Sequence, residues 1–188
     1  LAVEWSNYEQ YVVSTFEALK AEGRIGAWGV TAASVQEANR QVLKADRKPD
    51  VVQCIANLLD SPGSMAICNE KPDPREIISL AAKENVGVMG IRAVAAGALT
   101  ENIDRDVKPG SREALDFEKA ADFRRLAAKS GVSSAFLAHR YALSMIDVDT
   151  VVLGVKDRVE LKECLEAEAA GPLDQSMMNE IADCCSGD

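Results

Sequence analysis

The stretch that decides the fold is VGVMGIRAVAAGALT, Val86–Thr100. Its first part, Gly87–Ile91, is apolar throughout and predicts a short strand buried on both faces, as in a parallel sheet. The chain then brings Arg92 to the carboxyl end of this strand, followed by a loop of small residues around Gly97. Ligands bind at this edge of parallel α/β folds. We therefore expect the Arg92 guanidinium either to meet an anion or to form an ion pair within the fold.

The sequence before this stretch predicts two helices and two strands. An apolar stripe that ends at Gly23 indicates the first helix. Ser34 and Glu37 form a capping box that opens the second helix. In chain order, the predicted elements are a helix at Asn7–Glu22, a strand at Arg24–Val30, a helix from Ser34 to about Lys44 and a strand at Val51–Asn57.

A third helix precedes the central strand, and the longest loop follows it. Asp73 is the expected N-cap and Pro74 the first residue of this helix, which runs to about Glu84. The segment Thr100–Phe117 is polar and is predicted to be a lid or flexible flap. The remaining predicted elements are helices at Glu118–Lys129 and Ser133–Ser144, a strand at Asp149–Leu153, and helices at Asp157–Ala169 and Asp174–Asp183.

Strands that alternate with helices predict a parallel sheet in a single α/β domain, residues 1–188. No G-x-G-x-x-G sequence follows a strand, so a doubly wound dinucleotide fold would lack its phosphate-binding motif. Four strands suit either a small open sheet or half of an eight-stranded barrel. Periodicity does not distinguish these two architectures.

The net charge of −9 disfavours nucleic acid and anionic membrane surfaces as partners, because both require basic patches. No apolar run is long enough to span a membrane, and no signal-peptide pattern opens the chain. Five irregularly spaced cysteines and a single histidine argue against a disulfide framework and a metal site. We expect reduced thiols and a cytoplasmic location. Because the first residue is Leu1, we also expect a processed chain or a fragment.

Three polar side chains are predicted to meet at the carboxyl ends of the strands. Thr31, Gln53 and Arg92 each lie at or just inside a predicted strand end. Hydroxyl, carboxamide and guanidinium groups are suited to holding an amide or an anion rather than to transferring protons. The alternative is that a buried Gln53 only satisfies hydrogen bonds within the fold.

A possible phosphate site follows the last predicted strand, at Gly154, Val155, Lys156 and Arg158. A glycine turn, free backbone N–H groups, a helix N-terminus and two cations suit an anion. Against this interpretation, Asp157 and Glu160 place two carboxylates at the same helix start, which is ordinary capping.

The only histidine, His139, is predicted at the middle of a helix, far from the ligand edge of the sheet. We therefore expect a structural or surface role for it. No Ser/His/Asp catalytic set can be assembled around it, and the sequence offers no catalytic residue of its own.

Five segments, in the expected order, resemble the aldo-keto reductase family and together cover Thr15–Ala167. The segments are TFEALKAEGRIGAWGVTAAS (Thr15–Ser34), DVVQCIANLLD (Asp50–Asp60), VGVMGIRAVAAGALT (Val86–Thr100), SSAFLAHRYALS (Ser133–Ser144) and TVVLGVKDRVELKECLEA (Thr150–Ala167). The resemblance implies that the chain is the C-terminal half, strands five to eight, of a (β/α)8 TIM barrel. It also implies that a nicotinamide dinucleotide, NADP(H) or NAD(H), lies across the carboxyl ends of these strands.

The resemblance assigns cofactor positions to residues of this sequence. Thr31 and Gln53 would contact the nicotinamide carboxamide, and Ile91 lies where the family has a tyrosine that stacks on the nicotinamide ring. Arg92 lies where the family has a serine near the pyrophosphate. The phosphate loop would be Gly154, Val155 and Lys156, and the positions around the adenosine would be Glu160, Glu163 and Cys164.

Several of these positions depart from the family pattern. Ala32 replaces an asparagine that helps to hold the carboxamide, and Ile91 loses the aromatic stacking. Cys164 replaces an asparagine at the adenine, and Glu160 places negative charge where a 2′-phosphate would lie. The choice between NADP and NAD therefore stays open.

The family carries its catalytic Asp, Tyr, Lys and His on the first four strands of the barrel, which this sequence does not match. The resemblance implies an oxidoreductase that transfers a hydride between the nicotinamide and a small carbonyl or alcohol substrate, represented here by its cofactor-binding half and inactive alone. One alternative is a non-catalytic nucleotide-sensing or regulatory module of the same fold. Another is a half-barrel that associates with itself or a partner through open strand edges.

Overall fold

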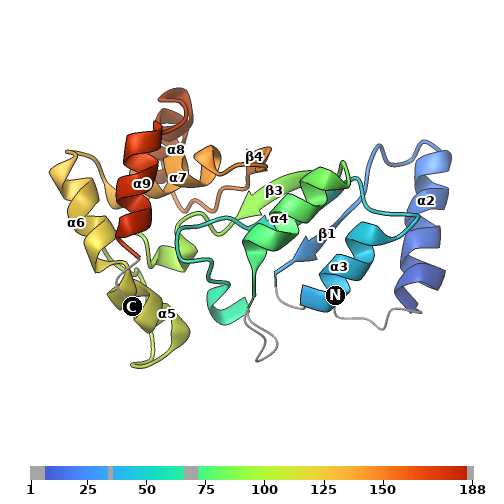
Figure 1. Ribbon diagram of the computed structural model, residues 1–188, viewed down its shortest axis with the longest axis horizontal. Helices are drawn as coiled ribbons and strands as arrows, with labels where there is room; N and C mark the ends of the chain where they lie inside the picture. Colours follow the sequence, from blue (N-terminus) through green and yellow to red (C-terminus); the bar gives the residue numbers. More distant parts are fainter. Residues whose placement is uncertain (1–6, 34–35, 66–71, 186–188) are drawn as a thin grey trace.

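The computed structural model describes residues 7–33, 36–65 and 72–185. These residues form a four-stranded sheet, and helices connect one strand to the next (Figure 1). The elements in chain order are η1 (Tyr8–Val13), α2 (Ser14–Ala21), β1 (Gly29–Ala32), α3 (Gln36–Lys44), β2 (Val51–Ile55), η2 (Gly63–Met65), α4 (Pro74–Lys83), β3 (Gly87–Ile91), η3 (Ala95–Gly97), α5 (Arg112–Lys119), α6 (Ala121–Lys129), α7 (Ser134–Ser144), β4 (Thr150–Val151), α8 (Arg158–Ala169) and α9 (Gln175–Asp183).

The sheet is parallel and its strand order is β1-β2-β3-β4, so each strand pairs with the next strand in the sequence. Thr31 pairs with Gln53, Gln53 with Met89, and Gly90 with Val151. The predicted α/β fold with a parallel sheet is confirmed. All four strands therefore end at one edge of the sheet.

The two faces of the sheet differ in burial. Helix α4 packs against β2 and β3, and the side chains of Val52, Cys54 and Val88 on that face are buried in the main core. On the opposite face, Met89 and Ile91 of β3 are only half-buried. The prediction that this central strand is buried on both faces was therefore wrong. Burial alternates along β3 because α4 covers a single face.

The first predicted strand was misplaced. The strand was expected at Arg24–Val30, whereas β1 spans Gly29–Ala32. Trp28 stacks on Phe16 with a ring-centroid distance of 5.6 Å, and its indole Nε1 donates to Glu17 at 2.6 Å. These contacts hold Trp28 against α2, so regular sheet pairing begins one residue later. The predicted helix at Asn7–Glu22 is confirmed as η1 followed by α2.

Two further boundaries differ from the prediction. The polar segment expected as a loop at Thr100–Phe117 ends earlier, because the Ser111 hydroxyl accepts from Ala114 N at 3.3 Å and caps α5. The strand expected at Asp149–Leu153 is reduced to β4, Thr150–Val151. β4 pairs with β3 over only two residues, so regular pairing ends early on that strand.

The helix caps read from the sequence are confirmed where the structure describes them. Asp73 accepts from Glu76 N at 3.0 Å ahead of Pro74, and Asp157 and Asp174 cap α8 and α9. The capping box assigned to Ser34 lies outside the described residues. Among the described helices, none is both long and apolar enough to cross a membrane.

Candidate functional site

The carboxyl edge of the sheet carries unusual backbone conformations. Asp60, Arg92, Ala95 and Ala96 have positive φ angles of 49°, 60°, 47° and 55°. Non-glycine residues adopt this left-handed region rarely and at an energetic cost, and such residues cluster at functional sites. The loops that follow β2 and β3 are therefore held in strained conformations at the edge where a ligand would bind.

Thr31 and Gln53 lie side by side on the face of the sheet that α4 does not cover. The Thr31 hydroxyl donates to Gln53 Oε1 at 3.1 Å across the β1–β2 pairing. Within the described residues, Gln53 Nε2 makes no hydrogen bond. The pair therefore keeps a free amide donor for a ligand. Gln53 is half-buried rather than buried, so the expected need for internal partners is weak.

Arg92 lies directly after β3 and is half-buried. Its Nε and Nη2 atoms are buried and have no hydrogen-bond partner in the part of the chain that the structure describes. Burial lowers the pKa of the guanidinium, while the carboxylate of Glu113 on α5 acts against this shift. A Cβ at Gly63 would lie 2.4 Å from Arg92 Nη2, so Gly63 permits the close approach of the guanidinium.

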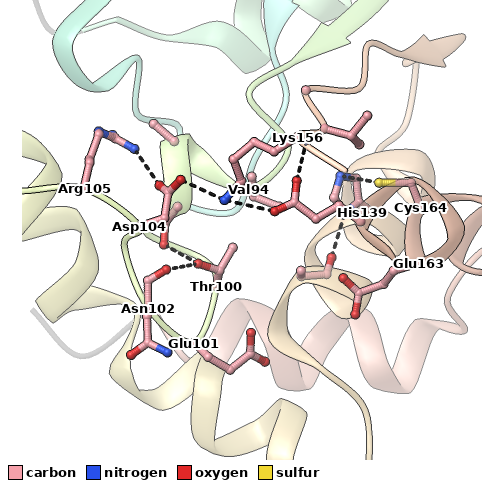
Figure 2. A pocket seen from close by; sticks show the side chains of 16 residues that line it. Val94, Thr100, Glu101, Asn102, Asp104, Arg105, His139, Lys156, Glu163 and Cys164 are labelled. Carbon is pink, nitrogen blue, oxygen red and sulfur yellow. Dashed lines mark hydrogen bonds and ion pairs between the residues drawn. The ribbon is translucent and has the colours of Figure 1, made fainter. Parts of the chain in front are cut away.

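A cavity of about 460 Å³ lies beside the loops that follow β3 and β4 (Figure 2). Its walls come from residues 94–105, from the first half of α7, and from the loop and helix after β4. The cavity contains six of the residues assigned by the resemblance: Gly154, Val155, Lys156, Glu160, Glu163 and Cys164. The chain thus brings together segments that are about 60 residues apart in sequence.

Lys156 lies at the centre of the charged groups of this cavity. Its Nζ atom lies 2.7 Å from Asp104 Oδ2 and 3.0 Å from Glu160 Oε1. Figure 2 shows the Asp104 side chain between Lys156 and Arg105. The hydrogen bonds that the Lys156 ammonium donates to Asp104 and Glu160 raise its pKa, and Lys156 lowers the pKa of Asp104.

Carboxylate side chains accept hydrogen bonds from backbone N–H groups at the start of α8, which borders the cavity. Glu160 Oε2 accepts from Lys156 N at 2.8 Å, and Asp157 Oδ1 accepts from the backbone of Val159 and Glu160. At these three positions the structure shows the capping that the sequence offered as the alternative, and not the free N–H groups of a phosphate site. The chain's own acidic side chains satisfy them, as helix capping requires.

His139 lines the cavity, so the prediction that it lies far from the ligand edge was wrong. Its Nδ1 lies 2.8 Å from the carbonyl oxygen of Ala135, and its Nε2 lies 3.4 Å from Cys164 Sγ. Since Nδ1 faces a carbonyl acceptor it carries the proton, and Nε2 accepts from the thiol. Burial raises the pKa of the Cys164 thiol.

The other assigned residues lie outside this cavity. Thr31 and Gln53 lie on the open face of the sheet, Ile91 is the last residue of β3, and Arg158 is exposed at the first position of α8. The sequence did not identify the cavity residues Thr100, Glu101, Asn102, Asp104, Arg105 and His139. The available signal was the long polar segment predicted as a lid. Among the described residues, no cluster of three His, Cys, Asp or Glu side chains could hold a metal ion.

Comparisons with known proteins agree with this architecture. The sequence matches the model of the Aldo/keto reductase family over residues 3–185. The apo form of the aldo-keto reductase AKR11C1 from Bacillus halodurans has a TM-score of 0.73 to this chain at 18% identity, and its holo form has 0.70 at 19%. The alignments cover 100% of this chain but 60% and 59% of the other chains, so this chain spans less than two thirds of their length. No curated protein matches the sequence. Because the family model covers almost every residue, the chain belongs to the aldo/keto reductase family.

Proposed function

We propose that the chain is the dinucleotide-binding part of an NAD(P)(H)-dependent oxidoreductase and forms strands five to eight of a (β/α)8 barrel. The observation that carries the proposal is the cavity at the ends of β3 and β4, which gathers six residues assigned to the cofactor. The family match and the parallel order of the strands support the barrel. Within the described residues, the outer edges of β1 and β4 pair with no strand, as expected for half of a barrel.

The residues present fit the three parts of a nicotinamide dinucleotide. Gln53 Nε2 is a free donor beside the Thr31 hydroxyl and suits the carbonyl oxygen of the nicotinamide carboxamide. The buried donors of Arg92 without partners suit the pyrophosphate. The cavity of about 460 Å³ has the size of a small-molecule pocket and would enclose the adenosine.

The proposed reaction is reduction of a small carbonyl compound or oxidation of the matching alcohol. A bound nicotinamide dinucleotide would supply or accept the hydride. The described residues of this chain would bind and orient the cofactor: Thr31 and Gln53 would hold the carboxamide, and the cavity would hold the adenosine. The proton-transferring groups would come from polypeptide outside this sequence, so we expect no turnover by the 188-residue chain alone.

A binding titration tests this proposal. We expect NADH or NADPH to bind the 188-residue chain, measured by calorimetry. Gln53→Met removes the free amide donor and should weaken binding about tenfold, as expected for loss of one buried hydrogen bond. The matched control is Gln175→Met on α9, whose amide bonds only Asn179 and lies away from the cavity.

The activity of a longer form distinguishes an oxidoreductase from a non-catalytic nucleotide-sensing module. A form extended at its N-terminus with the polypeptide that precedes it should reduce a small aldehyde with the bound cofactor. Binding without turnover in that form would favour a nucleotide-sensing module of the same fold. Absence of binding to either dinucleotide would contradict both functions.

A further inference from the structure

The cavity proposed to hold the adenosine is lined by more acidic than basic side chains. Four carboxylates line it, from Glu101, Asp104, Glu160 and Glu163, against the two cations Arg105 and Lys156. We infer that this cavity selects a dinucleotide whose adenosine ribose carries free hydroxyl groups, so that NAD(H) binds in preference to NADP(H). The inference rests on the proposed function and concerns the same site.

The two cations of the cavity are already neutralised by the protein. Lys156 Nζ contacts both Asp104 and Glu160, at 2.7 Å and 3.0 Å. Arg105 Nη1 lies 3.5 Å from Asp104 Oδ1. A 2′-phosphate carries about two negative charges and would have to compete with these carboxylates for each cation. The cations therefore offer it no unopposed positive charge.

The backbone donors that commonly bind phosphate at helix N-termini are also engaged. Glu101 Oε1 accepts from Ser134 N at the start of α7, at 2.6 Å. At the start of α8, Glu160 Oε2 accepts from Lys156 N, and Asp157 accepts from two further N–H groups. Since these bonds fix the carboxylates at the cavity wall, the acidic side chains cannot simply turn away from an incoming anion.

A ribose hydroxyl is attracted to these carboxylates, whereas a phosphate is repelled by them. Ionised carboxylates only accept hydrogen bonds, and a hydroxyl donates one. Glu163 lies at the cavity wall (Figure 2), where one of its oxygens accepts from the Ser133 hydroxyl. The remaining lone pairs of Glu160 and Glu163 can accept from the 2′- and 3′-hydroxyls of the ribose. A 2′-phosphate in the same place would be repelled by both carboxylates.

Titration with matched ligands tests this selectivity. The probes are NADH against NADPH, and ADP-ribose against its 2′-phosphorylated form, which isolates the adenosine end. We expect the chain to bind the unphosphorylated member of each pair about tenfold more tightly at low salt, as expected for repulsion by two partly exposed carboxylates. The preference should narrow as the salt concentration rises, because salt screens exposed charges.

Two variants test whether the carboxylates cause the preference for the unphosphorylated ligand. Glu160→Gln and Glu163→Gln should each narrow the ratio of the two dissociation constants about threefold. The control is Glu166→Gln, an exposed residue of the same helix that pairs with Lys162 at 3.4 Å and is outside the lining of the cavity. This control should leave the ratio unchanged.

The outcomes separate the inference from the proposed function. Equal or tighter binding of NADPH overturns the inference and leaves the proposed function standing. A preference for NADH that persists unchanged in both glutamine variants also overturns it, since the carboxylates then do not cause the preference. If neither dinucleotide nor ADP-ribose binds, the proposed function fails and the inference fails with it.

Discussion

The face of the sheet under α4 and the carboxyl edge of the same sheet differ in packing, in hydrogen bonding and in backbone conformation. Under α4, Val52, Val88 and Ile77 are at most 1% exposed and pack in one apolar core. At the carboxyl edge, Arg92 has buried donors that meet no partner among the described residues, and non-glycine residues have positive φ angles. The first region satisfies every packing requirement, whereas the second retains polar groups and strain.

In this sheet, the face under α4 stabilises the fold, and the carboxyl edge is the region suited to binding a ligand. Burial of apolar side chains stabilises the fold, and its effect is proportional to the area removed from water. Unpaired donors and left-handed residues cost free energy and persist at sites where a ligand supplies the missing contacts. Removal of an apolar side chain from the core should therefore lower the free energy of unfolding, whereas removal of an unpaired donor at the edge should raise it.

The largest expected effect is in the core. Ile77→Ala removes a side chain buried between α4 and the sheet and should lower the free energy of unfolding by about 3 kcal/mol, because a cavity remains. Urea denaturation measures this loss. The matched control is Ile146→Ala, whose side chain is 85% exposed and should change stability by less than about 0.5 kcal/mol. Equal losses in the two variants would contradict the description of the core.

A smaller loss is expected at the edge from Gly63→Ala. Gly63 has a φ of +54°, and an added Cβ would lie 2.4 Å from Arg92 Nη2, so both strain and contact oppose alanine. The free energy of unfolding should fall by about 2 kcal/mol. Gly110→Ala, at a φ of +74° with open space around it, reports the strain alone and should cost about 1 kcal/mol. A larger loss in Gly63→Ala would show that the Arg92 guanidinium is held in place, whereas equal losses would show that it moves aside.

Substitution of Arg92 should raise the free energy of unfolding instead of lowering it. Arg92→Met removes two buried donor atoms that have no partner in the described part of the chain, and should raise the free energy of unfolding by about 1 kcal/mol, while dinucleotide binding weakens. The contrasting control is Arg124→Met, since Arg124 donates to the carbonyl oxygens of Ala98 and Phe117 at 3.0 Å and 2.7 Å. That variant should lose stability. A loss of stability in Arg92→Met would show that the guanidinium is satisfied in solution.

The smallest expected effect is a pH dependence at Asp116. Burial raises the pKa of this carboxyl, although the Ser61 hydroxyl donates to it and opposes the shift. A raised pKa in the folded state means that Asp116 contributes stability below its usual pKa of about 3.9, and that this contribution is lost as the pH rises through the folded pKa. Asp116→Asn should therefore gain stability relative to the wild type at neutral pH and lose that gain in acid.

Chemical denaturation across this pH range measures the difference for Asp116→Asn. Asp106→Asn, at an exposed position of the long loop, removes one carboxylate without changing a buried group and controls for the change in net charge. A gain that is larger in acid than at neutral pH would contradict the direction of the Asp116 shift.

Much of the fold could be predicted from local sequence signals. Gly87–Ile91 is a strand with the predicted bounds, and the caps at Asp73 and Asp157 begin helices as expected. Strand bounds were wrong where a distant contact decides them. Trp28 packs on Phe16, and β4 pairs with β3 over only two residues. A sequence pattern does not contain these partners.

The candidate site was less predictable than the fold. The loop Gly154–Lys156 and residues of α8 were identified, but the opposite wall of the cavity was not. His139 was placed at the middle of a helix and expected to have a structural or surface role, because helical periodicity gives its face but not what that face meets. The contact of Lys156 with Asp104 was also not predicted, since Asp104 is 52 residues away in the chain.

The sequence by itself determined the order of helices and strands, their caps and the family to which the chain belongs. Those features depend on residues within a few positions of one another, where backbone propensity and capping act. Only the tertiary structure decided that Asp104 meets Lys156, that Cys164 meets His139 and that the buried donors of Arg92 meet no partner within residues 7–33, 36–65 and 72–185. These contacts join segments far apart in the chain, and their geometry follows from how the helices pack on the sheet.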